Sequence, residues 1–288
     1  MAEPVTAAMT GDALRFRTPE DRDTAMRSGV FLLEIPSDLD VSEADRLAAG
    51  FYDPGTLSPC GSSYRNLTSE RFDDQLIGFH ERSDQIEQFL LESRFWVGIY
   101  PEAVLQLAER LKTISRQVVR EALGYAGVPE DSWPVGSGGC SDGAGSYHLT
   151  FNHYRPGERR TGLSSHKDDG FVTILRAVEP GLEVNVDRHW EVVPTGPDVL
   201  VVNFGLAIEL LTRQAPRPIS AILHRVVEQR IDRTSYALFS SSFCAPGRDA
   251  GIYGYSPATG LKQICESRQL IFENDHEIYE GTEKPCDD

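Results

Sequence analysis

The stretch Ser165-His166-Lys167-Asp168-Asp169-Gly170-Phe171-Val172-Thr173-Ile174-Leu175 places a histidine and a carboxylate just before a run of apolar and β-branched residues. In an extended chain, residues two apart point to the same face, so His166 and Asp168 can bind one metal ion together. The pair alone is weak evidence, because seven histidines and 44 acidic residues produce such a spacing by chance. His189-Trp190-Glu191 repeats it and is an alternative ligand pair beside a predicted turn.

The chain around this stretch has the pattern of a β protein. Its segments are short, rich in Val, Ile and aromatic residues, and separated by Gly, Pro and Asp, which is typical of strands joined by turns. Seven or eight such strands predict a sandwich or jelly roll. The expected strands are Tyr147–Tyr154, Gly170–Ala177, Leu182–Val186, Trp190–Val193, Val199–Phe204, His224–Glu228 and Thr234–Phe243.

Residues 1–134 have a mainly helical pattern. A helix begins after Thr18 with proline at its first position and ends at Gly29, and a strand follows at Phe31–Ile35. Further helices are expected from Ser42 to Phe51, from Ser83 to Phe95 and, the longest, from Pro101 to Gly124. The longest has apolar residues three or four apart, which predicts a helix with one face in the core. Helices first and strands afterwards indicate one α+β unit with a mainly β core.

Two further segments frame the predicted β core, which spans residues 147–247. Residues 135–146 are rich in Gly and Ser and predict a flexible loop, with a mobile flap or a seam between helices and sheet as alternatives. Residues 248–288 form a C-terminal segment. Its last part, from Ile271, carries seven acids and one lysine. We expect a solvated, partly frayed tail there, and a lid over the barrel is the alternative.

Composition excludes several classes of protein. The charge balance of 28 − 44 = −16 disfavours a nucleic-acid partner, and no basic, aromatic-rich stretch appears. No apolar run approaches the ~20 residues of a membrane helix, and the first residues do not resemble a signal peptide. The five cysteines are odd in number and scattered, which predicts free thiols and a cytoplasmic location. Composition itself does not identify the partner, and the oligomeric state stays open.

Two downstream motifs strengthen the metal hypothesis. His224 lies 58 residues after His166 in the apolar setting Ile222–Val227, where a histidine could equally be a buried hydrogen-bonding residue. Two histidines and one carboxylate form the facial triad that leaves adjacent positions open on Fe(II). Strand alternation points Arg233 and Ser235 the same way, and a guanidinium beside a hydroxyl suits a carboxylate ligand. Considered alone, this last pair could be solvated surface.

The ordered series of motifs from about residue 147 to 246 resembles the isopenicillin N synthase-like family of Fe(II)/2-oxoglutarate oxygenases. The matching segments are Ser165–Leu175, Pro180–Val184, Trp190–Pro194, Val201–Gly205, His224–Val227 and Arg233–Ser235. The resemblance implies a double-stranded β-helix (jelly roll) with a helical N-terminal region. It also implies that His166, Asp168 and His224 are the iron ligands and carry the catalysis.

The resemblance further implies the co-substrate site. Arg233 and Ser235 correspond to the Arg-x-Ser pair that binds the distal carboxylate of 2-oxoglutarate, and Tyr154 stands where relatives have a tyrosine that helps hold it. Two departures are Lys167, where relatives commonly have threonine, and Leu206, where they usually have aspartate. We expect the side chain of Lys167 to face away from the metal.

The implied activity uses Fe(II), 2-oxoglutarate and O2 to oxidise a C–H bond of a small molecule, by hydroxylation, desaturation or ring closure. Specialised metabolism, including antibiotic biosynthesis, is the setting that the resemblance suggests. An oxidase of the same fold that uses no 2-oxoglutarate is an alternative, and so is a non-catalytic metal- or ligand-binding protein. His148 and His153 are weaker ligand candidates, and their spacing predicts opposite faces of the strand.

Overall fold

The computed structural model describes residues 4–55, 61–157 and 161–279. Its helices are α1 (Pro19–Ser28), α2 (Ser42–Ala48), α3 (Gly61–Arg65), α4 (Ser69–Phe72), α5 (Glu102–Ala126), α6 (Trp133–Gly136), α7 (Leu206–Thr212) and α8 (Ser267–Tyr279), with 3-10 turns at Ser93–Phe95 and Glu130–Ser132. Its strands are β1 (Thr6–Thr10), β2 (Ala13–Phe16), β3 (Val30–Glu34), β4 (Gly78–Glu81), β5 (Ile86–Glu92), β6 (Ser146–Tyr154), β7 (Leu163–His166), β8 (Val172–Arg176), β9 (Leu182–Val186), β10 (His189–Val192), β11 (Val199–Phe204), β12 (His224–Val226), β13 (Arg233–Ser241), β14 (Cys244–Ala245), β15 (Arg248–Asp249), β16 (Ile252–Ser256) and β17 (Gly260–Cys265).

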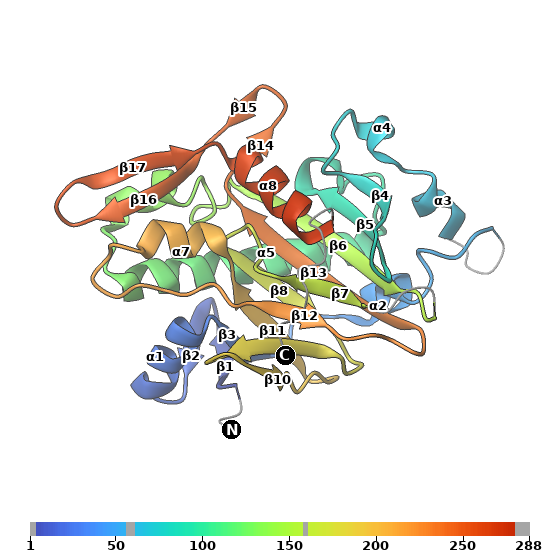
Figure 1. Cartoon of the computed structure of the whole chain (residues 1–288), viewed down its shortest axis with the longest axis horizontal. Coiled ribbons are helices and arrows are strands. Elements are labelled where there is room, and N and C mark those ends of the chain that lie inside the picture. Colours follow the sequence, from blue (N-terminus) through green and yellow to red (C-terminus); the bar gives the residue numbers. More distant parts are fainter. Residues whose placement is uncertain (1–3, 56–60, 158–160, 280–288) are drawn as a thin grey trace.

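Two sheets form the core of the molecule (Figure 1). The large sheet has the strand order β2-β1-β3-β11-β8-β13-β6-β5-β4, and the small sheet has the order β10-β9-β12-β7. Several neighbours in the order, such as β3 with β11 and β6 with β13, are far apart in the chain, and nearly all pairs are antiparallel, as in a jelly roll. The α+β jelly roll predicted from the sequence is confirmed.

Helices cover the outer face of the large sheet. The long helix α5 contacts β8 and β13, and α2 packs against both α5 and the sheet. The apolar stripe of α5, which includes Val104, Leu111 and Val118, is fully buried in the larger of two apolar clusters. The helix ends at Gly127 with φ of 79°, a left-handed conformation that favours glycine. These contacts give the strands of the site a rigid backing.

The space between the two sheets holds the second, smaller apolar cluster. Alternation along β13 turns Ala237, Phe239 and Ser241 into this space, whereas Tyr236 and Leu238 pack toward the helices. Each strand of the large sheet therefore presents one face to the helices and the other to the interior. The residues that line the site come from the inner face.

Most predicted elements are present, and one was wrong in kind. The helix predicted from Ser83 to Phe95 is instead β5 followed by a 3-10 turn. Glu, Gln and Leu have good helix propensity, but pairing with β4 and β6 and burial on both faces override it. Ser42 is the first residue of α2 rather than its cap, and that helix ends at Ala48. The first 134 residues thus add five strands, β1 to β5, to their helices.

The two segments outside the predicted core also differ from expectation. Residues 135–146, predicted to be flexible, are partly buried, and the backbone carbonyls of Cys140 and Ser141 accept hydrogen bonds from Tyr147 and Arg120. The predicted solvated tail is wrong for residues 271–279, because they belong to α8, which contacts β7 (Figure 1). Residues 280–288 lie outside the described part of the chain.

Candidate active site

Three side chains predicted as metal ligands converge between the sheets. His166 and His224 face each other as cross-strand partners on β7 and β12, and their ring centroids are 4.4 Å apart. Asp168 lies in the turn after β7, and its Oδ1 is 3.6 Å from the Nε2 atom of each histidine. One potential ligand atom from each residue lies within 4.8 Å of the others. Two imidazoles and one carboxylate on three neighbouring positions suit Fe(II).

Neighbouring groups orient each of the three side chains. The Nδ1 atoms of His166 and His224 lie 2.7 Å and 3.3 Å from the backbone carbonyls of Ser164 and Ile222. If each Nδ1 donates to its carbonyl, Nε2 carries the free lone pair toward Asp168. The hydroxyl of Thr173 donates to Oδ2 of Asp168 at 2.6 Å, so Oδ1 remains available. This outer set of hydrogen bonds fits a metal site.

The protonation states of the three groups also suit a cation. Burial raises the pKa of Asp168, but the two imidazoles and the Thr173 hydroxyl outweigh it and lower that pKa to about 2. Burial lowers the pKa of His224 to about 4, so its ring is neutral. For His166, burial lowers the pKa, but the hydrogen bond and charge of Asp168 outweigh burial and raise it. A metal ion would therefore compete with a proton for the His166 ring.

A buried arginine, Arg233, lies in the same space between the two sheets as the triad. Arg233 is 1% exposed, and its Nε donates to the carbonyl of Pro180 at 3.1 Å. Its Nη1 and Nη2 atoms have no hydrogen-bond partner among the described residues. The guanidinium lies 4.7 Å from the ring centre of Tyr154, its cross-strand partner, and Ser235 follows on the same face of β13. An uncompensated buried cation is costly, which fits a site for an anionic ligand.

The interior between the sheets opens as a cavity lined by the triad and by Tyr154, whereas Arg233 and Ser235 are buried beside it. The space between its lining residues, counted together with the open solvent at its mouth, is about 1060 Å³. The triad and Tyr154 line it together with apolar side chains such as Leu175 and Phe239. Helix α8 lines it as well, and the side chain of Asn274 donates to the carbonyl of Lys167 at 3.0 Å. The side chain of Lys167 contacts Glu209, away from the triad, as expected.

The weaker candidates lie elsewhere or have other partners. His148 lines the cavity from β6, and His153 lies on the opposite face of that strand, as its spacing predicted. His153 contacts Glu87 and Asp232 rather than the triad. His189 is exposed on β10, and among the described residues neither it nor Glu191 belongs to a three-ligand cluster.

A hydrogen-bonded chain that the sequence did not reveal joins the base of the cavity to α8. Asn152 donates to the hydroxyl of Ser235 at 3.3 Å, and Gln88 donates to Asn152 at 3.0 Å. The hydroxyl of Tyr279 then donates to Gln88 at 3.4 Å. Alternation from Tyr154 could have placed Asn152 on this face, but Gln88 was assigned to a helix and Tyr279 to a tail.

Comparison with known sequences identifies the β core. Residues 146–242 match the 2OG-Fe(II) oxygenase superfamily. A 1-aminocyclopropane-1-carboxylate oxidase of Persea americana is 27% identical over 185 residues, which are 61% of this chain and 56% of that protein. Jasmonate-induced oxygenase 2 of Arabidopsis thaliana is 32% identical over 145 residues, which are 48% of this chain and 37% of that protein. The matched segments thus span about half, or less, of these relatives.

Solved structures show the same fold across most of the chain. The crystal structure of JOX2 in complex with 2OG, Fe and JA has a TM-score of 0.72 at 20% identity, covering 95% of this chain and 85% of that one. The crystal structure of the dioxygenase for auxin oxidation in rice has a TM-score of 0.58 at 21% identity, covering 76% of this chain and 75% of that one. Residues 146–242 thus match the 2OG-Fe(II) oxygenase superfamily and the solved structures share the fold, which confirms the resemblance noted from the sequence.

Proposed function

We propose that this protein is an Fe(II)- and 2-oxoglutarate-dependent oxygenase that oxidises a C–H bond of a small molecule. His166, Asp168 and His224 would hold the metal, and Arg233, Ser235 and Tyr154 would hold the distal carboxylate of 2-oxoglutarate. When bound, the metal and the 2-oxo acid supply the activation of O2 and the oxidising power. The relatives whose names carry oxidase or oxygenase activities support this proposal.

The observation that carries the proposal is the unpaired guanidinium of Arg233 in the same interior as the triad. A triad alone also fits an Fe(II) oxidase that uses no 2-oxoglutarate, whereas a buried cation with two free N–H edges matches a carboxylate. The protein contributes geometry: it orients Asp168 through Thr173, fixes both imidazoles through carbonyls, and would hold the distal carboxylate at the buried Arg233.

Turnover with and without 2-oxoglutarate tests the proposal. The Fe(II)-loaded protein should consume O2 and form succinate only when 2-oxoglutarate is present, and a substrate found by screening small molecules should accelerate both. His224→Ala should abolish this turnover, while His189→Ala, which changes an exposed histidine, should not. Consumption of O2 by the screened substrate without 2-oxoglutarate would favour the oxidase, and absence of Fe(II) binding would favour a non-catalytic protein.

We also propose a cytoplasmic location and a role in specialised metabolism such as antibiotic biosynthesis. Cys140, Cys244 and Cys265 are unpaired among the described residues, which supports a reducing compartment. Within the same part of the chain, no helix combines the length and apolar character needed to cross a bilayer. The metabolic role rests on the resemblance to isopenicillin N synthase-like enzymes. Fractionation of the producing cells and identification of the substrate test the two proposals separately.

A further inference from the structure

The proposed co-substrate clamp lies where two strands end. Arg233 is the first residue of β13, Tyr154 is the last residue of β6, and the two are paired in register. Residues 230–232 before Arg233 are exposed. Strand ends open more easily than strand centres, because their backbone hydrogen bonds have no neighbour on one side. Something must therefore keep this end of the sheet in place if Arg233 and Tyr154 are to bind a ligand with fixed geometry.

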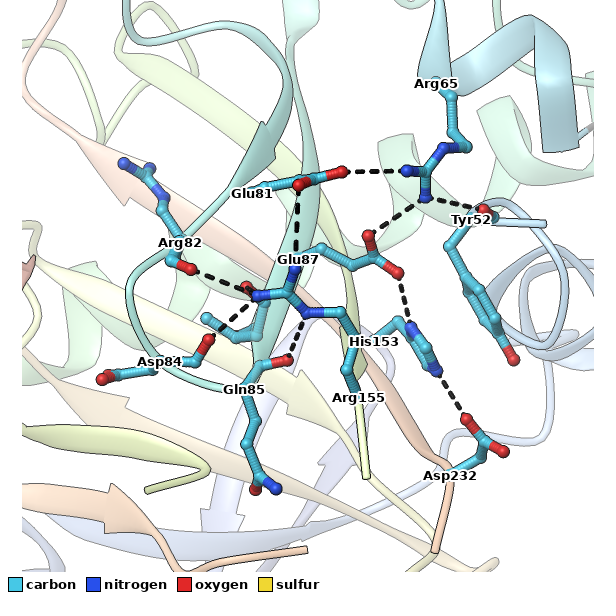
Figure 2. Close-up of polar contacts among 11 residues, drawn as sticks. Tyr52, Arg65, Glu81, Arg82, Asp84, Gln85, Glu87, His153, Arg155 and Asp232 are labelled. Carbon is cyan, nitrogen blue, oxygen red and sulfur yellow. Dashed lines mark hydrogen bonds and ion pairs between the residues drawn. The ribbon is translucent and has the colours of Figure 1, made fainter. Parts of the chain in front are cut away.

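The residues next to the clamp are tied together on the opposite face of the sheet. Asp232 precedes Arg233, and its Oδ1 lies 2.8 Å from Nε2 of His153, which precedes Tyr154. The other ring nitrogen of His153 lies 2.7 Å from Oε1 of Glu87 on β5 (Figure 2). Both ring nitrogens of His153 thus lie within hydrogen-bonding distance of a carboxylate oxygen.

The surroundings hold this histidine in one orientation. The ring of Tyr52 stacks on it with centroids 3.4 Å apart and planes 1° from parallel. Arg65 donates to Oε2 of Glu87 at 3.1 Å and to Glu81 at 2.9 Å (Figure 2). The side chains of Glu87 and His153 are only 4% and 6% exposed, so both are fixed by their neighbours.

Tyr154 is anchored from its other side as well. Arg155 donates to the backbone carbonyls of Arg82, Asp84 and Gln85 in the turn between β4 and β5 (Figure 2). Both neighbours of Tyr154 are therefore bound to β5 or its turn, whereas Arg233 is held on its N-terminal side by the Asp232 contact. Without that contact, the nearest tie on the N-terminal side of Arg233 is Gln229, four residues away, which is hydrogen-bonded to Gln85.

We propose that His153 and Asp232 are positioning residues that hold Arg233 and Tyr154 in the geometry for the distal carboxylate of 2-oxoglutarate. This inference rests on the proposed function. A role in stability alone is a poor account of Asp232, because its side chain is 67% exposed and buries little surface. The contact instead joins the two strands at the residues that adjoin the clamp.

Ligand binding by the Fe(II)-loaded protein without O2 tests the proposal. Asp232→Ala removes the contact, and Asp232→Asn keeps an oxygen that can accept from His153. The matched control is Asp198→Ala, because Asp198 is also exposed and directly precedes a strand, β11, that starts at the same end of the large sheet. Titration calorimetry with 2-oxoglutarate is compared with 2-oxobutyrate, a 2-oxo acid that lacks the distal carboxylate.

Asp232→Ala should weaken binding of 2-oxoglutarate by about threefold to fivefold, the size expected for one exposed charged contact. Asp232→Asn should recover most of the affinity, Asp198→Ala should match the wild type, and no variant should change the affinity for 2-oxobutyrate. Unchanged 2-oxoglutarate affinity in Asp232→Ala, or equal loss for both acids, would overturn the positioning role. Failure of the wild type to bind 2-oxoglutarate would overturn the proposed function itself.

Discussion

Replacing Arg233 with methionine should weaken 2-oxoglutarate binding without destabilising the ligand-free protein. The side chain is fully buried, and its two terminal nitrogens have no partner among the described residues. Methionine fills a similar elongated space and carries no charge. The substitution therefore has two effects. Loss of the ligand contact weakens the binding of 2-oxoglutarate, whereas loss of the uncompensated buried charge stabilises the ligand-free fold.

The structure sets the size of each effect. Each hydrogen bond to a charged group contributes about 1.5–3 kcal/mol, so loss of two should raise the Kd for 2-oxoglutarate by roughly 100-fold or more. In the ligand-free protein, the variant loses the bond from Nε to Pro180 and the contact with Tyr154, about 1 kcal/mol each. Relief of the unpaired charge offsets this loss, because an unpaired buried ion costs several kcal/mol.

Arg176→Met is the matched control. Arg176 is also buried on the large sheet, but its guanidinium is paired with Asp45 at 3.0 Å and donates to the carbonyls of Gly196 and Pro197. Its replacement should lower the free energy of unfolding by about 2–3 kcal/mol, at the low end for a buried pair because Asp45 is partly exposed. It should leave 2-oxoglutarate binding unchanged.

Thermal unfolding without 2-oxoglutarate measures the stability of the ligand-free protein, and unfolding with 2-oxoglutarate measures the stabilisation that binding adds. The wild type should gain about 2.7 kcal/mol of stability at a ligand concentration of 100 Kd, and Arg233→Met should gain almost nothing at that concentration. The reasoning is refuted if Arg233→Met is destabilised as strongly as Arg176→Met, or if its affinity for 2-oxoglutarate stays within about threefold of the wild type.

Three further perturbations have defined outcomes. Thr173→Val removes the hydroxyl that orients Asp168 and should weaken Fe(II) binding about 10-fold in an anaerobic titration, with the melting temperature little changed. Burial raises the pKa of Asp249, but hydrogen bonds from the backbone N–H groups of Arg268, Ser267 and Gly251 outweigh burial and lower that pKa. The ionised carboxylate therefore stabilises the fold above the ordinary pKa of aspartate, and this stabilisation is lost as the pH falls through the pKa of the folded state. Asp249→Ala should therefore cost about 1 kcal/mol at pH 7, and unfolding measured at decreasing pH should show this cost shrinking once the pH falls below about 3.9, the ordinary pKa of aspartate. Asn274→Ala removes the contact between α8 and Lys167 and should speed amide exchange in residues 267–279 relative to the exchange in α5; equal rates in variant and wild type would contradict the contact.

The site was predictable from the sequence where its residues follow local rules. His166 and Asp168 are two positions apart, Arg233 and Ser235 alternate along one strand, and the intervening strands have apolar runs bounded by turns. Each feature depends on the period of an extended chain, which the sequence displays directly. The pairing of His224 with His166 is a long-range contact, and only the resemblance to a family linked them before the structure did.

Other parts of the site depend on contacts that no local pattern encodes. Residues 86–92 contain good helix formers, and only pairing with β4 and β6 makes them a strand. Gln88 reaches the interior for that reason. Helix α8 is acidic and only weakly apolar, so the sequence suggested a solvated tail, whereas Asn274 and Tyr279 fix it through polar contacts to distant residues. Such contacts have no periodic signature.

A protein with a net charge of −16 can still bind an anion, because its exposed carboxylates and the buried guanidinium of Arg233 act over different distances. Exposed carboxylates are screened beyond about 8 Å at physiological salt, whereas the buried guanidinium of Arg233 acts at contact in a medium of low dielectric. Two acids next to the clamp on the outer face, Glu87 and Asp232, both contact His153, and Glu87 also accepts a hydrogen bond from Arg65. These acids therefore have hydrogen-bond partners of their own, whereas Arg233 is buried with two terminal nitrogens that have no partner among the described residues, and it is the group that an anionic ligand would satisfy.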